Sequence, residues 1–178
     1  MPEYSEKKPD RTSLLIWDAE GEPPEGEWTS VLWREFVSNA QSNTVSIPAI
    51  IENNADLLRK RYLAWVYELG EKSIQGKRFV EHLELRPSFS YWWMTLFAEK
   101  CNYSKSKQID DAIRLMAFDK WAKNQSIRRV VLSTANQSLA KCIRLWCTNL
   151  DVDFEWQRIK KSIVPLSWVK RIYHEAPH

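Results

Sequence analysis

The sequence predicts a Rossmann-like α/β domain of three layers, in which several helices pack on a mostly parallel sheet. Two stretches support this fold class. Residues 127–156 have the pattern strand, helix, strand, and residues 13–17 form a short, continuous apolar run that ends in polar and turn-forming residues. A strand–helix–strand succession implies parallel strands, and a continuous apolar run is typical of a strand buried on both faces.

The strand–helix–strand stretch also contains candidate ligand-binding residues. Residues 127–134 are rich in β-branched side chains, residues 139–150 carry an apolar stripe at helical spacing, and residues 152–156 alternate between apolar and polar. The N-terminus of a helix attracts anions. No glycine-rich fingerprint follows the first strand, so a dinucleotide is not predicted. The candidate substrate-binding residues at this junction are Ser133, Thr134 and Asn136.

The apolar run at 13–17 is followed by two acidic residues, Asp18 and Glu20, and then by a loop rich in glycine and proline. In open α/β sheets, ligands bind at the carboxyl ends of the strands. Asp18 and Glu20 are therefore candidate catalytic residues, acting as a general base or as acceptors for a ligand hydroxyl. The alternative is that they bind loop backbone or cap the next helix.

Periodicity predicts the elements between these two stretches. We expect an amphipathic helix over 28–40, a brief strand at 45–48 that proline ends, and helices over 53–69 and 108–123. Gly70 follows the second of these helices and is expected to stop it.

The stretch 85–99 is the most aromatic part of the chain. Its proline breaks the preceding structure, and Ser88 or Ser90 is expected to cap a helix that presents one apolar stripe. In one interpretation this helix belongs wholly to the core. In the other, polar residues at its edge line a ligand cleft. The candidate substrate-binding residues here are Arg86, Ser90, Tyr91, Trp92 and Glu99.

Composition limits the classes of function. The chain has 178 residues, a net charge of +3 and three cysteines that match no metal or redox spacing. We therefore expect one domain, or half of a two-domain enzyme, with reduced thiols, no metal, no cofactor and no nucleic-acid partner. Local basic clusters such as residues 59–61 are usually solvated, and contact with anionic lipid or phosphate is the alternative.

The chain is expected to divide into three parts. Residues 1–12 are predicted to be a disordered tail whose polar character does not fit a signal peptide, and residues 13–160 the α/β domain. Residues 161–178 are basic and aromatic, and are expected either to lie at a membrane surface or to link to a partner domain. No run approaches the roughly 20 apolar residues that a membrane span needs.

The chain resembles the N-terminal part of a family of bacterial surface carbohydrate biosynthesis proteins. The resemblance rests on the succession Leu14-Leu15-Ile16-Trp17-Asp18, on Leu85-Arg86-Pro87-Ser88-Phe89-Ser90-Tyr91-Trp92-Trp93-Met94 with Ala98-Glu99-Lys100, and on Ile109 to Trp121. It covers residues 13–156, and the aromatic stretch is its distinctive part. Members of this family are transferases linked to O-antigen and capsule gene clusters. They look like two-lobed GT-B glycosyltransferases, and this chain is expected to correspond to the part before the second lobe.

The resemblance implies an acceptor-side lobe that binds a glycan or a lipid-linked acceptor, with the nucleotide sugar held by a second lobe. Such a protein is expected in the cytoplasm, at the inner face of the membrane. Asp18 or Glu20 would then serve as base or acceptor ligand, and Arg86 and Tyr91 would contact sugar or phosphate. Ser133 and Asn136 would lie at the ligand-binding helix N-terminus. The alternative is a non-catalytic protein-interaction domain with an aromatic-rich surface.

Overall fold

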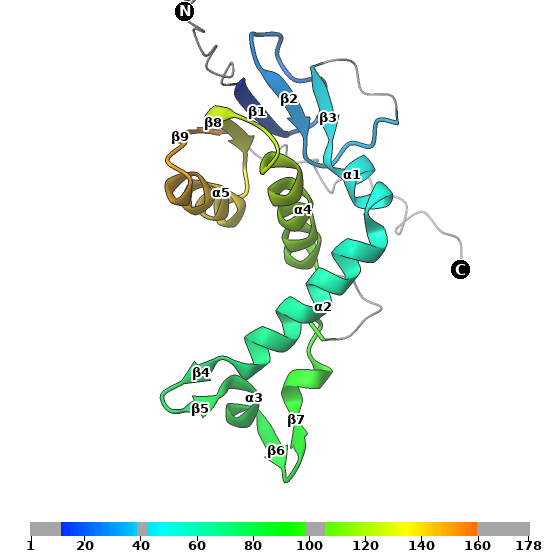
Figure 1. The fold of residues 1–178 in the computed structure, drawn as a ribbon, viewed down its shortest axis with the longest axis vertical. Coiled ribbons are helices and arrows are strands. Elements are labelled where there is room, and N and C mark those ends of the chain that lie inside the picture. The colour runs from blue at the N-terminus through cyan, green and yellow to red at the C-terminus, as the bar shows by residue number, and fades with distance from the viewer. Residues whose placement is uncertain (1–11, 39–42, 99–105, 160–178) are drawn as a thin grey trace, which may run out of the picture.

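The computed structural model describes residues 12–38, 43–98 and 106–159. At its centre is a five-stranded sheet of order β3-β2-β1-β8-β9, in which all neighbouring strands are parallel (Figure 1). The strands are β1 (Thr12–Asp18), β2 (Thr29–Leu32), β3 (Thr44–Ser46), β8 (Ile127–Thr134) and β9 (Asp153–Arg158). This sheet confirms the predicted Rossmann-like α/β fold class. The tail was predicted over residues 1–12; residues 1–11 of it and the segment 161–178 lie outside the described residues, and Thr12 begins β1 instead.

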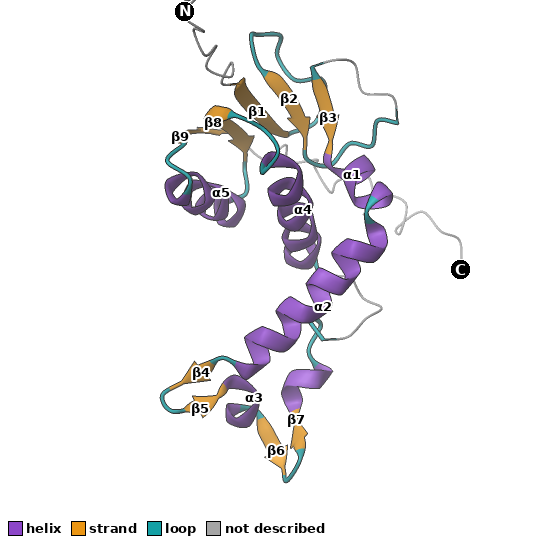
Figure 2. Ribbon diagram, in the orientation of Figure 1, coloured by secondary structure: helices purple, strands orange, loops and turns teal. Residues whose placement is uncertain are grey.

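Four longer helices accompany the sheet (Figure 2). They are α1 (Ile47–Asn53), α2 (Ala55–Glu71), α4 (Lys107–Ala122) and α5 (Gln137–Asn149). Figure 1 shows α2 running away from the sheet, with a group of short elements at its far end. These elements are β4 (Ser73–Ile74), β5 (Lys77–Arg78), α3 (Phe79–His82), β6 (Glu84–Arg86), β7 (Phe89–Ser90) and the 3-10 helix η1 (Tyr91–Met94). We call residues 72–98 the arm tip.

The main core lies between one face of the sheet and helices α4 and α5. Leu14 and Ile16 of β1 share this face with Val130 and Leu132 of β8. The apolar stripe of α5 is buried against them, as its spacing predicts. Leu15, which points to the opposite face, is also buried, so the prediction of a first strand buried on both faces is confirmed.

A second, smaller core joins α2 to the arm tip. Its buried members are Tyr62, Val66, Val80, Trp92 and Ile109. Helix α2 also contributes Leu58 to the main core, and α4 contributes Ile109 to the smaller core and Phe118 to the main one, so both helices connect the two apolar clusters.

The prediction of an α-helix over the aromatic stretch is wrong. Phe89–Ser90 form β7, which pairs antiparallel with β6, and only Tyr91–Met94 are helical, as one 3-10 turn that Ser90 caps. The backbone N–H and the hydroxyl of Thr95 both donate to the Trp92 carbonyl, at 3.1 and 2.7 Å, and so occupy the acceptor that a continuing α-helix needs. The predicted apolar stripe is thereby split, since Trp92 is 3% exposed and Trp93 51%.

The predicted helix over 28–40 is also wrong, because its first part is strand β2. Thr29–Leu32 pair in parallel with β1, which puts Val31 on the helix-covered face of the sheet and Leu32 on the other. Apolar residues next to each other in sequence suit a strand buried on both faces, whereas a helix would bring them to one side. Pairing with a distant strand outweighs the local pattern here.

Gly70 lies within α2, which ends at Glu71, so its predicted role as a helix stop is wrong. It is buried against the arm tip instead. A Cβ at this position would lie 2.8 Å from Trp92 Nε1 and 2.9 Å from Val80 Cγ1, distances too short for ordinary contact. The missing side chain is what allows the 3-10 turn and α3 to close on α2.

Replacing Gly70 with alanine is expected to loosen the arm tip. Alanine favours a helix interior by roughly 1 kcal/mol, but overpacking typically costs about 1–3 kcal/mol, and Trp92 must move to admit the methyl group. Hydrogen exchange should therefore become faster in residues 72–98 and stay unchanged in β1 and β8. Slower exchange in the arm tip of the variant would show that helix propensity dominates and that Trp92 can move aside without loss of stability.

The described cysteines form no disulfide: Cys142 is exposed and Cys147 is buried, and both are free. Burial raises the pKa of the Cys147 thiol to about 12. Cys147 therefore acts as a small apolar side chain of the core.

Candidate functional site

The carboxyl ends of β1 and β8 lie side by side at the point where the strand order reverses. From β1 the chain goes to β2 on one side, and it returns later to β8 on the other. The register pairs Asp18, the last residue of β1, with Thr134, the last residue of β8. In open α/β sheets this topological switch point is the usual place for a ligand.

Asp18 is held in place by two partners. Its side chain is 3% exposed, and Thr134 Oγ1 donates to Oδ2 at 2.6 Å. Arg34, from the loop after β2, donates through Nε to Oδ1 and through Nη2 to Oδ2 at 3.4 Å. The carboxylate is therefore buried but charge-paired and oriented.

Arg34 connects this buried pair to solvent. Its side chain remains 43% exposed. Burial opposes its charge, but the hydrogen bond to Asp18 and the charges of Asp18, Asp111 and Asp110 outweigh that, so the pKa of Arg34 is raised. An exposed guanidinium beside a fixed carboxylate can bind a ligand oxygen while Asp18 accepts a ligand hydroxyl.

A second buried carboxylate, Asp111 of α4, lies next to the first. Its Oδ1 accepts from Trp33 Nε1 at 3.0 Å and from Arg114 Nη1 at 3.3 Å, and Arg34 Nη2 lies 3.9 Å away. Its Oδ2 accepts from Asn136 Nδ2 at 2.9 Å. Asp111 thus links α4 to the loop after β2 and to the start of α5.

Asn136 completes the network as the N-cap of α5. Its Oδ1 accepts from the backbone N–H groups of Ser138 and Leu139 at 3.1 and 3.2 Å, and its own N–H donates to Thr134 Oγ1 at 2.9 Å. Two of the helix N–H groups that could bind an anion are therefore already satisfied by Asn136. The chain of hydrogen bonds runs without a break from Asp18 through Thr134 and Asn136 to Asp111.

A cavity of about 580 Å³ lies beside this network, between α2 and α4. Arg114, which bonds Asp111, is also part of the cavity wall. The other lining residues are mostly apolar with a few charges: Ile51, Ala55, Leu58, Arg59, Tyr62, Leu63, Asp110 and Ile113. Such a mixture is typical of a site for a small organic ligand.

The structure brings together three of the residues predicted at the sheet edge: Asp18, Thr134 and Asn136. Glu20 is exposed in the loop that follows β1. Ser133 points to the opposite face of the sheet, where its hydroxyl donates to Gln157 Oε1 of β9 at 3.1 Å. Only the first three therefore share one network.

Four of the residues predicted on the aromatic stretch, all except Glu99, belong to the arm tip, which Figure 1 shows at the far end of α2 from the sheet. Arg86 lies over the Phe89 ring at 4.9 Å, and Ser90 donates to the Val80 carbonyl at 2.6 Å. Trp92 is buried and Tyr91 is half exposed. Glu99 lies outside the described residues. These residues and the sheet-edge network thus form two separate groups.

Sequence reasoning missed Arg34, Asp111 and Arg114. For Arg34 a signal existed, because recognition of β2 as a strand would have put Trp33 and Arg34 at the same carboxyl edge as Asp18. Asp111 and Arg114 lie outside the apolar stripe of a correctly predicted helix, and no local pattern separates them from the other charges on its surface.

Comparisons of the chain with family models, with curated proteins and with solved structures return no match. Within residues 12–38, 43–98 and 106–159, no helix combines the length and apolar character that crossing a membrane requires. The same described residues contain no group of three or more His, Cys, Asp or Glu side chains that could hold a metal ion.

Proposed function

We propose that this chain is the acceptor-side lobe of a glycosyltransferase-like enzyme of bacterial surface polysaccharide biosynthesis. In this proposal a glycan or lipid-linked acceptor binds at the carboxyl edge between β1 and β8, and a second lobe binds the nucleotide sugar. The observation that carries the proposal is the buried Asp18 carboxylate, held between Arg34 and Thr134 at the switch point of a parallel sheet.

The chemistry of the pair fits a hydroxylated acceptor. An ionised carboxylate offers about four lone-pair positions, so Asp18 can accept a ligand hydroxyl in addition to its bonds from Thr134 and Arg34. A fixed acceptor of this kind orients the hydroxyl that attacks the sugar donor, and can take its proton as a general base. The exposed part of Arg34 serves a second oxygen of the same ligand.

The direct test is ligand-detected NMR of the purified chain with a panel of acceptor glycans and a panel of nucleotide sugars. We expect binding of a glycan and no binding of the free nucleotide sugars. A folded chain that binds neither panel would contradict the proposal, and a chain that binds nucleotide sugars alone would reverse the assignment of the lobe.

Replacing Asp18 with asparagine is expected to weaken glycan binding by roughly tenfold to a hundredfold, because a hydrogen bond to a charged group contributes about 1.5–3 kcal/mol. The change keeps the shape of the side chain and removes its charge. The matched control is Glu20→Gln, which removes the same charge from the exposed loop two residues later and should leave binding unchanged. Equal binding by a folded Asp18→Asn chain would exclude Asp18 from the site.

A second candidate function, a protein-interaction domain, is favoured by one observation. The arm tip carries several large apolar side chains that are exposed to solvent: Leu85, Tyr91, Trp93, Met94, Leu96 and Phe97. Grouped apolar exposure is typical of interaction surfaces. If this surface binds a second copy of the chain, sedimentation should depend on protein concentration, and Trp93→Glu should abolish that dependence. A native chain that stays monomeric at high concentration would count against this candidate.

A further inference from the structure

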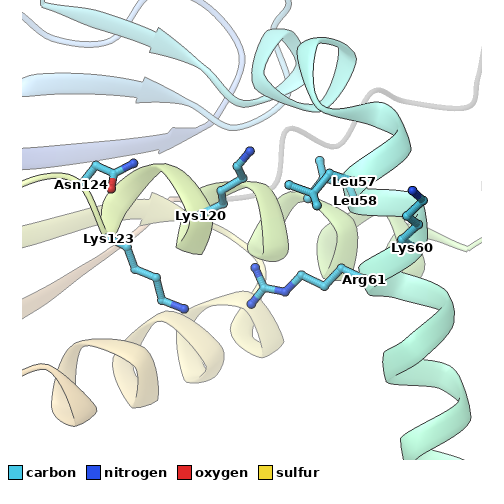
Figure 3. Close-up of a pocket in the computed structure, with 7 residues that line it drawn as sticks. All are labelled: Leu57, Leu58, Lys60, Arg61, Lys120, Lys123 and Asn124. Carbon is cyan, nitrogen blue, oxygen red and sulfur yellow. The ribbon is translucent and has the colours of Figure 1, made fainter.

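A second cavity, of about 650 Å³, lies where α2 passes α4, and four of its seven lining residues are cationic. Figure 3 shows Leu57, Leu58, Lys60 and Arg61 coming from α2, and Lys120, Lys123 and Asn124 from the C-terminal end of α4 and the residues just after it. None of these residues belongs to the Asp18 network. We call them the basic pocket.

Among the described residues, the cations of the basic pocket outnumber the carboxylates that form ion pairs with them. None of its lining residues is acidic. The carboxylate paired with it is Asp119, whose Oδ2 lies 2.7 Å from Arg61 Nη2 and 3.0 Å from Lys123 Nζ. Four cations against one carboxylate leave three positive charges unbalanced. Such a concentration of one sign within a hollow attracts an anion.

The cations are partly fixed before any ligand arrives. Arg61 donates to the Met116 carbonyl at 3.2 Å as well as to Asp119, and Lys120 donates to Asn54 Oδ1. Figure 3 shows Arg61 and Lys123 extending toward one another across the pocket. Pre-ordered side chains lose less conformational entropy on binding, which favours a ligand that contacts several of them together.

We propose that the basic pocket binds the phosphate of a phosphate ester or diphosphate. A single carboxylate would balance only one of the three excess charges, whereas a multiply charged phosphate group matches them more closely and accepts hydrogen bonds from both arginine and lysine. Leu57, which is half exposed, and Leu58 give the pocket an apolar wall for the organic part of the ligand. The phosphate source is either a soluble ester or the headgroup of an anionic lipid.

The test uses two probes, inorganic pyrophosphate and vesicles of phosphatidylcholine with or without phosphatidylglycerol. Binding of pyrophosphate is measured by calorimetry and binding of vesicles by flotation. Lys60→Glu combined with Lys123→Glu reverses two exposed charges of the pocket and should weaken binding at least about tenfold. The control, Lys77→Glu with Lys141→Glu, makes the same change in net charge at two exposed lysines outside the pocket and should retain binding.

Binding of pyrophosphate without binding of vesicles supports a soluble phosphate ester, and binding that requires phosphatidylglycerol supports a lipid headgroup. Failure of the folded native chain to bind either probe overturns the proposal, as does an equal loss in the pocket variant and its control. If the glutamate variant does not fold, Lys60→Ala with Lys123→Ala tests the same residues, and a smaller loss of binding is then expected. The Asp18→Asn chain should keep its phosphate binding. The proposal for the basic pocket and the proposal for the acceptor site are therefore tested separately.

Discussion

Replacing Phe118 with alanine is expected to lower the free energy of unfolding by about 3–5 kcal/mol, the upper part of the range for truncating a buried apolar side chain. Phe118 is fully buried in α4. Its ring lies 5.0 Å from that of Trp146 in α5, 6.2 Å from that of Trp121 and 6.3 Å from that of Trp33. One side chain therefore joins α4 and α5 to the loop that follows β2.

The size of this effect follows from what surrounds the ring. Three indoles pack against Phe118, and rigid aromatic neighbours cannot collapse to fill the space that its removal leaves. The loss therefore contains both the transfer of the ring out of water and the cost of a cavity. Aromatic pairs add roughly 0.5–1.5 kcal/mol each beyond the area that they bury.

Urea denaturation followed by circular dichroism measures the change. The matched control is Phe36→Ala, which deletes the same ring from a position that is 52% exposed and should change stability by less than about 0.5 kcal/mol. If Phe118→Ala lost no more stability than this control, the role assigned to Phe118 in packing α4 against α5 would be wrong.

The sequence correctly predicted the elements whose local pattern of side chains agrees with their contacts in the folded chain. In β8, α5 and β9 the β-branched run, the helical stripe and the alternation each match the structure, because the local pattern of each element agrees with the way that the fold buries it. The long helices α2 and α4 were predicted for the same reason. The larger errors lie at 28–40, where β2 pairs with β1, and at 85–99, where a short hairpin takes the first residues and Thr95 ends the helical turn that follows. Smaller errors are Gly70, which lies within α2, and Ile47-Pro48, which begin α1 instead of ending a strand.

The candidate site was predictable only in part. Asp18, Thr134 and Asn136 follow from one rule, that side chains at the carboxyl ends of adjacent parallel strands meet. Asp111 joins them through the side chain of Asn136, a residue 25 positions away in the sequence, and periodicity contains no information about such a contact. The resemblance to surface carbohydrate biosynthesis proteins stays a prediction, and the acceptor-binding test addresses it.

Replacing Asp111 with alanine is expected to destabilise the fold by about 3 kcal/mol or more and to disrupt the carboxyl edge of the sheet. The change removes a nearly buried acceptor from Trp33 Nε1, Arg114 and Asn136 together. A buried N–H that loses its only partner costs about 1–3 kcal/mol, and Arg114 also loses its counter-charge.

Two further variants separate charge from hydrogen bonding at this position. Asp111→Asn keeps one oxygen that can accept and should fall between the native chain and Asp111→Ala in denaturation experiments. Asp110→Ala removes a carboxylate from the neighbouring residue of α4, which bonds neither Trp33 nor Asn136, and should cost much less.

The same variants show whether Asp111 supports the site as well as the fold. Because Asn136 Nδ2 donates to Asp111, and Asn136 also caps α5 and donates its backbone N–H to Thr134, loss of Asp111 should loosen the residue that positions Thr134 against Asp18. Glycan binding by Asp111→Asn should therefore weaken even where the chain remains folded. If a folded Asp111→Asn chain bound glycan like the native chain, the Asp111 side of the network would be structural, and the acceptor would depend on Asp18, Arg34 and Thr134 alone.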